Sequence, residues 1–165
     1  MKRVVLYISA LFLTMLSSCK PSPKEAAAFN DRVMSEQKKV VMAYDGLLET
    51  YDTYIARKMD SALLVFTSQT NKAIENVTDI TPVKDGEILK VAVLEYLNVY
   101  KSVAENEADE LVRLYKVPEN EFTPELKAKW DLMYKDADTK LKEADKKLQA
   151  VQAVFAENFH LKLAK

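Results

Sequence analysis

The side chains in this sequence that could take part in the most kinds of chemistry are its one cysteine, Cys19, and its one histidine, His160. With a single cysteine, no intramolecular disulfide can form. A Ser/His/Asp triad and a di-metal site built from two Glu-x-x-His motifs are also out of reach, because one histidine near the carboxyl end cannot serve them. Two glycines do not make a Gly-rich phosphate loop. We therefore expect no enzymatic activity, no metal site and no bound cofactor.

His160 has one sharper interpretation that involves Met34. If the last helix ends beside the start of the first, these two side chains lie near each other, and a His–Met pair can ligate haem inside a helical bundle. Against this, His160 stands next to Phe159 rather than on the apolar stripe of its helix. An exposed histidine at the end of a helix is the better prediction.

Charged residues are abundant but evenly mixed. The chain has 24 basic and 25 acidic side chains, and removal of Lys2 and Arg3 with a leader peptide would leave 22 against 25. This balance argues against electrostatic binding of nucleic acid. An acidic run, which could suggest a hard-cation site, is more consistent with a solvated face. It comprises Glu105, Glu107, Asp109 and Glu110.

The first nineteen residues have the order of an export signal. Two basic residues, Lys2 and Arg3, precede an uncharged apolar segment from Val4 to Leu16. As a helix this segment would span only about 20 Å, too short for a hydrocarbon core of about 30 Å. A secretory signal is therefore favoured over the alternative of an uncleaved membrane helix.

The junction Leu16-Ser17-Ser18-Cys19 resembles the lipobox of bacterial lipoproteins. That resemblance implies diacylglycerol on the Cys19 thiol, cleavage after Ser18, and a palmitate-type acyl chain on the new amino terminus. Two or more acyl chains hold a protein firmly on a membrane. The resemblance also implies that Lys20 permits outer-membrane sorting, with the periplasmic and the external face both left open. The expected organisation is a signal peptide over 1–18, a tether over 19–22 and a helical domain over 23–165.

Apolar residues recur at helical spacing along the rest of the chain and predict four helices. The scarcity of glycine disfavours a β fold with many tight turns. We expect an all-α, antiparallel up-down-up-down four-helix bundle with helices through the following positions: Ala26 to Tyr51, Met59 to Ile80, Leu89 to Tyr115, and Leu126 to Phe159.

Caps and prolines predict most of the helix boundaries. Ser22-Pro23-Lys24-Glu25 and Thr123-Pro124 are typical helix starts, and Pro118 marks a helix end. Asp85 is the expected cap of the third helix. The weak boundary lies near Asp52, where a capped turn is favoured but one helix continuous through both segments stays open.

Polar and aromatic residues on the stripes suggest further detail. Gln37, Gln69 and Thr70 could form a buried polar layer that fixes the register of the helices. Tyrosines on or near the stripes suit a bundle seam, although they would also suit a ligand groove. These tyrosines are Tyr44, Tyr51, Tyr96, Tyr100 and Tyr115. On the last helix, acid-before-base pairs predict a solvated face: Asp131/Lys135, Asp136/Lys140, Asp138/Lys142 and Glu143/Lys147.

The chain resembles a family of small helical lipoproteins of Gram-negative bacteria that are catalogued as surface or hypothetical proteins. The resemblance rests on segments such as Gln37-Lys38-Lys39-Val40-Val41, Leu97-Asn98-Val99-Tyr100-Lys101-Ser102 and the closing His160-Leu161-Lys162-Leu163. It implies a lipid-anchored bundle and supplies no catalytic residues. The expected function is a non-enzymatic envelope lipoprotein with a structural or protein-interaction role. The alternative is a ligand-binding lipoprotein that holds a hydrophobic or aromatic molecule between helices.

Overall fold

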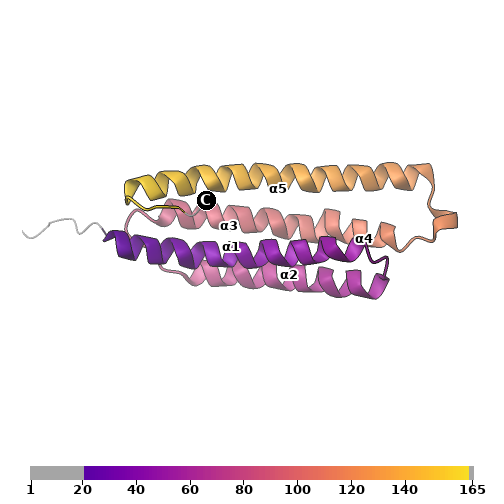
Figure 1. Cartoon of the computed structure of the whole chain (residues 1–165), viewed down its shortest axis with the longest axis horizontal. Helices are drawn as coiled ribbons and strands as arrows, with labels where there is room; N and C mark the ends of the chain where they lie inside the picture. Colours follow the sequence, from indigo (N-terminus) through magenta and orange to yellow (C-terminus); the bar gives the residue numbers. More distant parts are fainter. Residues whose placement is uncertain (1–20, 164–165) are drawn as a thin grey trace, which may run out of the picture.

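The computed structural model describes residues 21–163, which form an all-α bundle of four long rods (Figure 1). The first rod is α1 (Pro23–Tyr51) and the second is α2 (Ala56–Asp79). The third combines α3 (Glu87–Val103), a π-helical turn η1 (Ala104–Ala108) and α4 (Asp109–Tyr115). A short 3-10 turn η2 (Glu119–Glu121) leads to α5 (Pro124–Asn158). Neighbouring rods run in opposite directions, so the predicted up-down-up-down bundle is confirmed.

The bundle has two distinct ends. The proximal end holds the start of α1, the α2–α3 connection and the end of α5, whereas the distal end holds the α1–α2 and α4–α5 connections (Figure 1). With 35 residues, α5 runs almost the whole length of the bundle, about 50 Å at 1.5 Å per residue.

The predicted starts of α1 and α5 are confirmed. The Ser22 hydroxyl accepts a hydrogen bond from Glu25 N at 3.3 Å, and Ser22 N donates to Glu25 Oε2 at 2.7 Å, which completes a capping box. The Thr123 hydroxyl accepts from Leu126 N at 3.3 Å. Each cap is followed by a proline at the first helical position, where its missing N–H costs nothing.

The predicted break near Asp52 is confirmed. Asp52 is the C-terminal cap of α1, with its backbone N–H bonded to Thr50 O. The second helix begins four residues later, behind Ile55, which gives no side-chain cap. Between them Tyr54 adopts a left-handed backbone conformation with φ 51°. The turn thus combines the left-handed Tyr54 with hydrogen bonds of the Thr53 hydroxyl, and α2 starts without a side-chain cap.

The predicted cap at Asp85 is wrong. Asp85 has φ 66°, and the residue before α3 is Gly86, without a side-chain cap. A Cβ on Gly86 would lie 2.9 Å from Val83 Cγ2 and 3.0 Å from Phe29 Cε1. The close approach of this turn to α1, rather than a cap, explains the glycine.

Each of the four rods turns one side toward a single shared core. Phe66 of α2, Leu47 of α1 and Leu97 of α3 are fully buried, as are Leu89 and Met59. Full burial of a side chain of this size stabilises the fold by about 1.5–3 kcal/mol. The stripes predicted from helical spacing therefore do face inward.

Polar cross-links between rods set their register, although not as one layer. Gln37 donates to Tyr96 Oη at 3.1 Å, whereas the buried Thr70 bonds within its own helix to Phe66 O at 2.8 Å, and Gln69 is half-exposed. The predicted layer is therefore wrong for two of its three members. Further cross-links between rods include Asn76 to Glu36 at 3.0 Å and Gln152 to Asn30 at 3.0 Å.

Candidate functional site

The most open side of the bundle lies between α1 and α5. The Cα atoms of these two helices almost nowhere come within 8 Å of each other, whereas the other neighbouring rods pack closely. At the proximal end Phe29 and Phe155 bridge the two helices with ring centroids 5.8 Å apart. Further along, a cavity of about 340 Å³ opens between them, with α3 as its floor.

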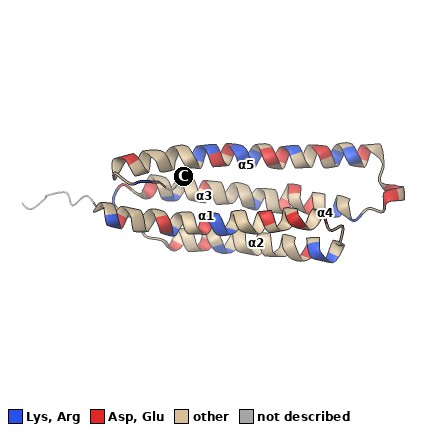
Figure 2. Ribbon diagram, viewed as in Figure 1, with Lys and Arg blue, Asp and Glu red and all other residues tan. Residues whose placement is uncertain are grey.

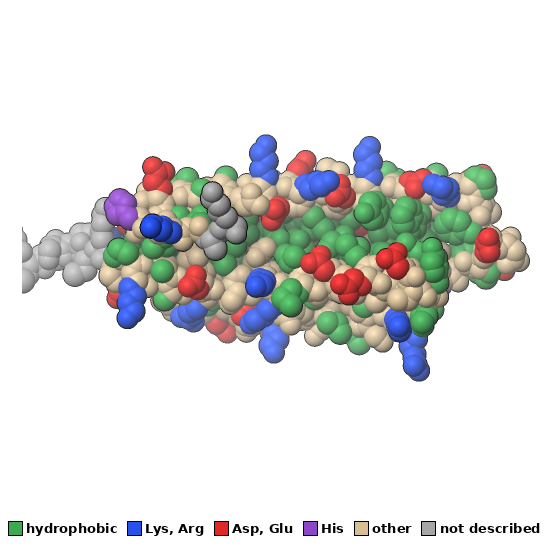
Figure 3. Space-filling view, viewed as in Figure 1, with side chains coloured by type: hydrophobic (Ala, Val, Ile, Leu, Met, Phe, Trp, Pro, Cys, Tyr) green, Lys and Arg blue, Asp and Glu red, His purple; other side chains and the backbone are tan. Residues whose placement is uncertain are grey.

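We call this cavity the tyrosine groove. Figure 3 shows hydrophobic side chains exposed along the line between α1 and α5, with acidic side chains beside them. Three helices contribute to its lining. The lining residues are Gln37, Val41, Tyr44, Asp45 and Leu48 of α1, Tyr96 and Tyr100 of α3, and Tyr134, Asp138, Leu141, Lys142 and Asp145 of α5.

A chain of hydrogen bonds organises the floor of the tyrosine groove. Gln37 Nε2 donates to Tyr96 Oη, and Tyr96 donates to Tyr100 Oη at 3.0 Å. Burial raises the pKa of Tyr100, and the hydrogen bond with Tyr96 adds to the effect. Burial also raises the pKa of Tyr44 to about 12, with contributions from Tyr134 and Asp138. These phenols therefore stay neutral at physiological pH and serve as hydrogen-bonding groups on apolar rings.

Carboxylates dominate the rim of the tyrosine groove. Asp45, Asp138 and Asp145 face a single lysine, Lys142, whose Nζ bonds Asp138 Oδ2 at 2.7 Å. Gln149 donates to Asp145 Oδ2 at 2.8 Å. The lining thus carries a formal charge of −2 around aromatic walls. Such a surface suits an apolar or aromatic molecule, and an attached cationic group would meet the rim favourably.

The predicted tyrosines divide between two places. Tyr44, Tyr96 and Tyr100 meet in the tyrosine groove, whereas Tyr51 and Tyr115 stack on each other at the distal end, 4.5 Å apart. The sequence did not single out Tyr134, because it lies off the apolar stripe of α5. Its spacing of four residues from Trp130, which it stacks on at 5.4 Å, was the available signal.

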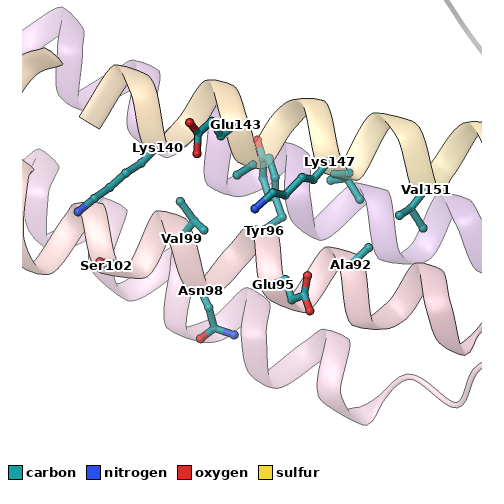
Figure 4. Close-up of a pocket in the computed structure, with 12 residues that line it drawn as sticks. Ala92, Glu95, Tyr96, Asn98, Val99, Ser102, Lys140, Glu143, Lys147 and Val151 are labelled. Carbon is teal, nitrogen blue, oxygen red and sulfur yellow. The ribbon is translucent and has the colours of Figure 1, made fainter. Parts of the chain in front are cut away.

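A second groove lies between α3 and α5 (Figure 4). It measures about 570 Å³, and its apolar surface comes from residues such as Ala92 and Val99 on α3 and Val151 on α5. Its charges are balanced, with Glu95 and Glu143 against Lys140 and Lys147. In Figure 4, Lys140 extends from α5 toward α3 rather than into solvent.

Glu107 is the partner of Lys140, and it corrects the prediction of a solvated acidic face. The Glu107 side chain is buried, its Oε1 is hydrogen-bonded to Lys140 Nζ, and its Oε2 is buried with no hydrogen-bond partner. The extra residue in the π-helical turn shifts the register of the third rod and so turns Glu107 inward.

The other acids of that run are each held by a cation. Lys129 bonds Glu110 at 2.6 Å, Arg113 bonds Asp109 at 2.9 Å, and Lys101 lies 3.8 Å from Glu105. Across residues 21–163, no group of three or more His, Cys, Asp or Glu side chains is arranged to hold a metal ion.

The charge pairs of α5 are only partly those predicted. Figure 2 shows acids and lysines alternating along α5, as expected for a solvated face. Within the described residues, Asp138–Lys142 forms as predicted, but Asp131 pairs with Lys127 at 2.7 Å and Lys140 pairs across to Glu107. The predictions Asp131/Lys135 and Asp136/Lys140 are therefore wrong, because neighbouring partners compete for the same groups, and among the residues that the structure describes the predicted Glu143/Lys147 pair is not formed either.

The remaining sequence candidates are His160, Met34 and Cys19. His160 is exposed just after α5, as expected, and Met34 is half-buried in α1. Cys19 and the preceding leader lie outside the described residues. In the described part of the chain, no helix has the length and apolarity needed to cross a membrane.

No protein-family model matches this chain, and neither the curated proteins nor the solved structures contain a significant match to it.

Proposed function

We propose that this chain is a bacterial envelope lipoprotein, held on a membrane through acyl chains on Cys19 and acting by binding rather than by catalysis. The observation that carries this proposal is the uncharged segment from Val4 to Leu16, which leads directly into Leu16-Ser17-Ser18-Cys19. Helix α1 begins at Pro23, only four residues after the cysteine. Acyl chains there would hold the proximal end close to the bilayer and present the distal end away from it.

Two variants test the anchor in the native organism. Metabolic labelling with a palmitate analogue should tag the wild-type chain, and Cys19→Ser should lose the label and move to the soluble fraction. Lys20→Ala is the matched control, since it alters the neighbouring residue but keeps the acceptor thiol. Failure of the wild-type chain to take up label, or membrane retention of Cys19→Ser, would contradict the anchor.

Outer-membrane sorting is proposed from Lys20 and has its own test. Lys20→Asp should shift the labelled protein from the outer-membrane to the inner-membrane fraction. An unchanged distribution would contradict sorting by this position. Protease added to intact cells then distinguishes an external from a periplasmic face.

A role in protein interaction or envelope structure accords with the chemistry of the surface. Glu105, Glu107, Asp109 and Glu110 of the third rod are paired with lysines or arginines, and His160 is exposed just after α5. Crosslinking in intact envelopes tests this role, because reproducible partners that are lost with Cys19→Ser would identify a membrane-located assembly.

The tyrosine groove favours a second candidate function, binding of an aromatic or hydrophobic small molecule. Its support is the separation of α1 from α5 over neutral phenols and a carboxylate rim. Native mass spectrometry of the chain purified from its own envelope should show a retained small molecule. Tyr134→Ala should reduce that retention, and Leu64→Ala, which truncates an exposed side chain on α2, should not. A mass equal to the apoprotein would contradict this function.

A further inference from the structure

A separate pocket at the distal end is lined by aromatic rings from four different segments. It measures about 620 Å³ and lies outside the tyrosine groove. Tyr54 comes from the α1–α2 connection, Tyr115 from the end of α4, Phe122 from the α4–α5 connection and Trp130 from α5. We call it the distal aromatic pocket. The other lining residues are Leu114, Val117, Glu119 and Lys127.

The rings of this pocket are held at steep angles to one another. Tyr115 meets Tyr54 at a centroid distance of 6.2 Å and an interplanar angle of 63°, and it meets Trp130 at 6.0 Å and 80°. Tyr115 and Trp130 are each stacked on a further ring, Tyr115 on Tyr51 and Trp130 on Tyr134. The walls are therefore fixed by packing and differ in direction, as in an aromatic cage.

Tyr54 lies outside the core, and its ring contact is with Tyr115 at the pocket. The residue is 79% exposed, and its φ of 51° is a conformation that residues other than Gly, Asn and Asp rarely adopt. Hydrogen bonds of Thr53 hold the turn, with its hydroxyl donating to Thr50 O at 2.7 Å and accepting from Ile55 N at 3.3 Å. Tyr54 thus holds an exposed ring at the pocket edge despite an unfavourable backbone conformation. Such a combination indicates that the ring has a role other than packing in the core.

The lining of the distal aromatic pocket holds one carboxylate, Glu119, and one lysine, Lys127, whose charge is offset by an acid outside the lining. Lys127 is paired with Asp131 at 2.7 Å, and Lys116 is bonded to Asp60, so both lysines are matched. Glu119 lines the pocket itself. The pKa of Tyr115 is raised by burial, by Tyr54 and by the carboxylate of Asp52.

We propose that the distal aromatic pocket binds a compact organic cation, of the trimethylammonium class, against the faces of Tyr54, Tyr115 and Trp130. The ring quadrupoles attract a cation whose charge is spread over methyl groups, and such a cation loses little hydration on entering. Glu119 adds attraction that a neutral guest of the same shape would not feel. An anionic guest is disfavoured by the same carboxylate.

The chain carries its own probe, because Trp130 is its single tryptophan. Full-length chain in a non-ionic detergent is titrated with choline while Trp130 emission and the indole N–H resonance are recorded. The matched guest is the tert-butyl analogue of choline, in which carbon replaces the charged nitrogen. We expect saturable binding of choline, and binding of the neutral analogue weaker by roughly 2- to 30-fold.

Two variants separate the cage from the fold. Tyr54→Gly removes the ring at a position where glycine is favoured, so the bundle should stay folded while choline affinity falls by roughly 2- to 30-fold. Glu119→Gln should weaken choline binding and leave the neutral analogue unchanged. Leu64→Ala is the control and should bind like the wild type. Equal binding of both guests, wild-type affinity in Tyr54→Gly, or no saturable signal up to about 50 mM choline would overturn the proposal.

Discussion

Lys140 of α5 reaches across to the third rod and bonds Glu107, a carboxylate that the π-helical turn places inside the bundle. The two sides of this pair differ in environment. Glu107 is only 6% exposed, whereas the Lys140 side chain keeps 44% of its surface in solvent. The carboxylate thus depends on one partially hydrated lysine, and its second oxygen is unsatisfied.

Lys140→Ala should destabilise the bundle by about 1–3 kcal/mol, because it leaves a buried carboxylate without its donor. The double variant Glu107→Leu, Lys140→Ala should recover much of that loss, since no buried charge then remains. Urea unfolding followed by circular dichroism gives both values.

The control for Lys140 is Lys129, which bonds Glu110 from the same helix in a more exposed setting. Lys129→Ala should cost less than about 1 kcal/mol. Equal costs for the two lysines would show that the burial of Glu107 has no energetic consequence.

Alanine substitution of the two glycines should change the stability of the bundle in opposite directions. Gly86→Ala should destabilise the bundle by about 1–3 kcal/mol, because the new methyl would meet Val83 and Phe29 at 3.0 Å or less. Gly46 lies inside α1 with open space around the position of a Cβ, so Gly46→Ala should stabilise by about 0.5–1 kcal/mol. Thermal melts of the two variants test this, and shifts of the same sign would contradict it.

The architecture was predictable because local signals and burial agree. The Ser22 and Thr123 caps and Pro118 fix helix boundaries through contacts within a few residues. The stripes that include Phe66 and Leu97 bury as their spacing requires. The turn after Tyr51 was the weakest prediction, since no glycine or proline marks it and Tyr54 adopts a conformation uncommon for tyrosine.

Features that depend on contacts between rods could not be read from the sequence. The π-helical turn has no local signature in Ala104–Ala108, and it reverses the expected exposure of Glu107. The width of the gap between α1 and α5 depends on how all four rods pack against one another. The tyrosine groove and the position of Tyr134 in it are therefore visible only in the folded structure.

Acid should weaken the fold through Glu36. Burial alone raises the pKa of this carboxyl, but hydrogen bonds from Lys39 and Asn76 outweigh burial and hold the pKa below its ordinary value of 4.5. A lowered pKa in the folded state means that the stabilisation is complete above pH 4.5 and is lost as pH falls through the folded pKa. Glu36→Gln should therefore show a shallower loss of unfolding free energy in acid than the wild type. Parallel acid curves for the two proteins would contradict the role of Glu36.

High pH should weaken the fold through Tyr44, whereas low pH weakens it through Glu36. Burial first, and then Tyr134 and Asp138, raise the pKa of Tyr44 from 10.0 to about 12. Because the folded state holds this proton more tightly, the stabilisation is complete below pH 10.0 and is lost as pH rises toward about 12. Tyr44→Phe keeps the ring that packs on Phe66 at 5.3 Å but has no proton to lose, so its unfolding free energy should fall less steeply over this range. Urea unfolding at a series of alkaline pH values measures the slopes. Phenolate absorbance checks that Tyr44 ionises only as the bundle opens, and equal slopes for Tyr44→Phe and the wild type would rule out a contribution from this phenol.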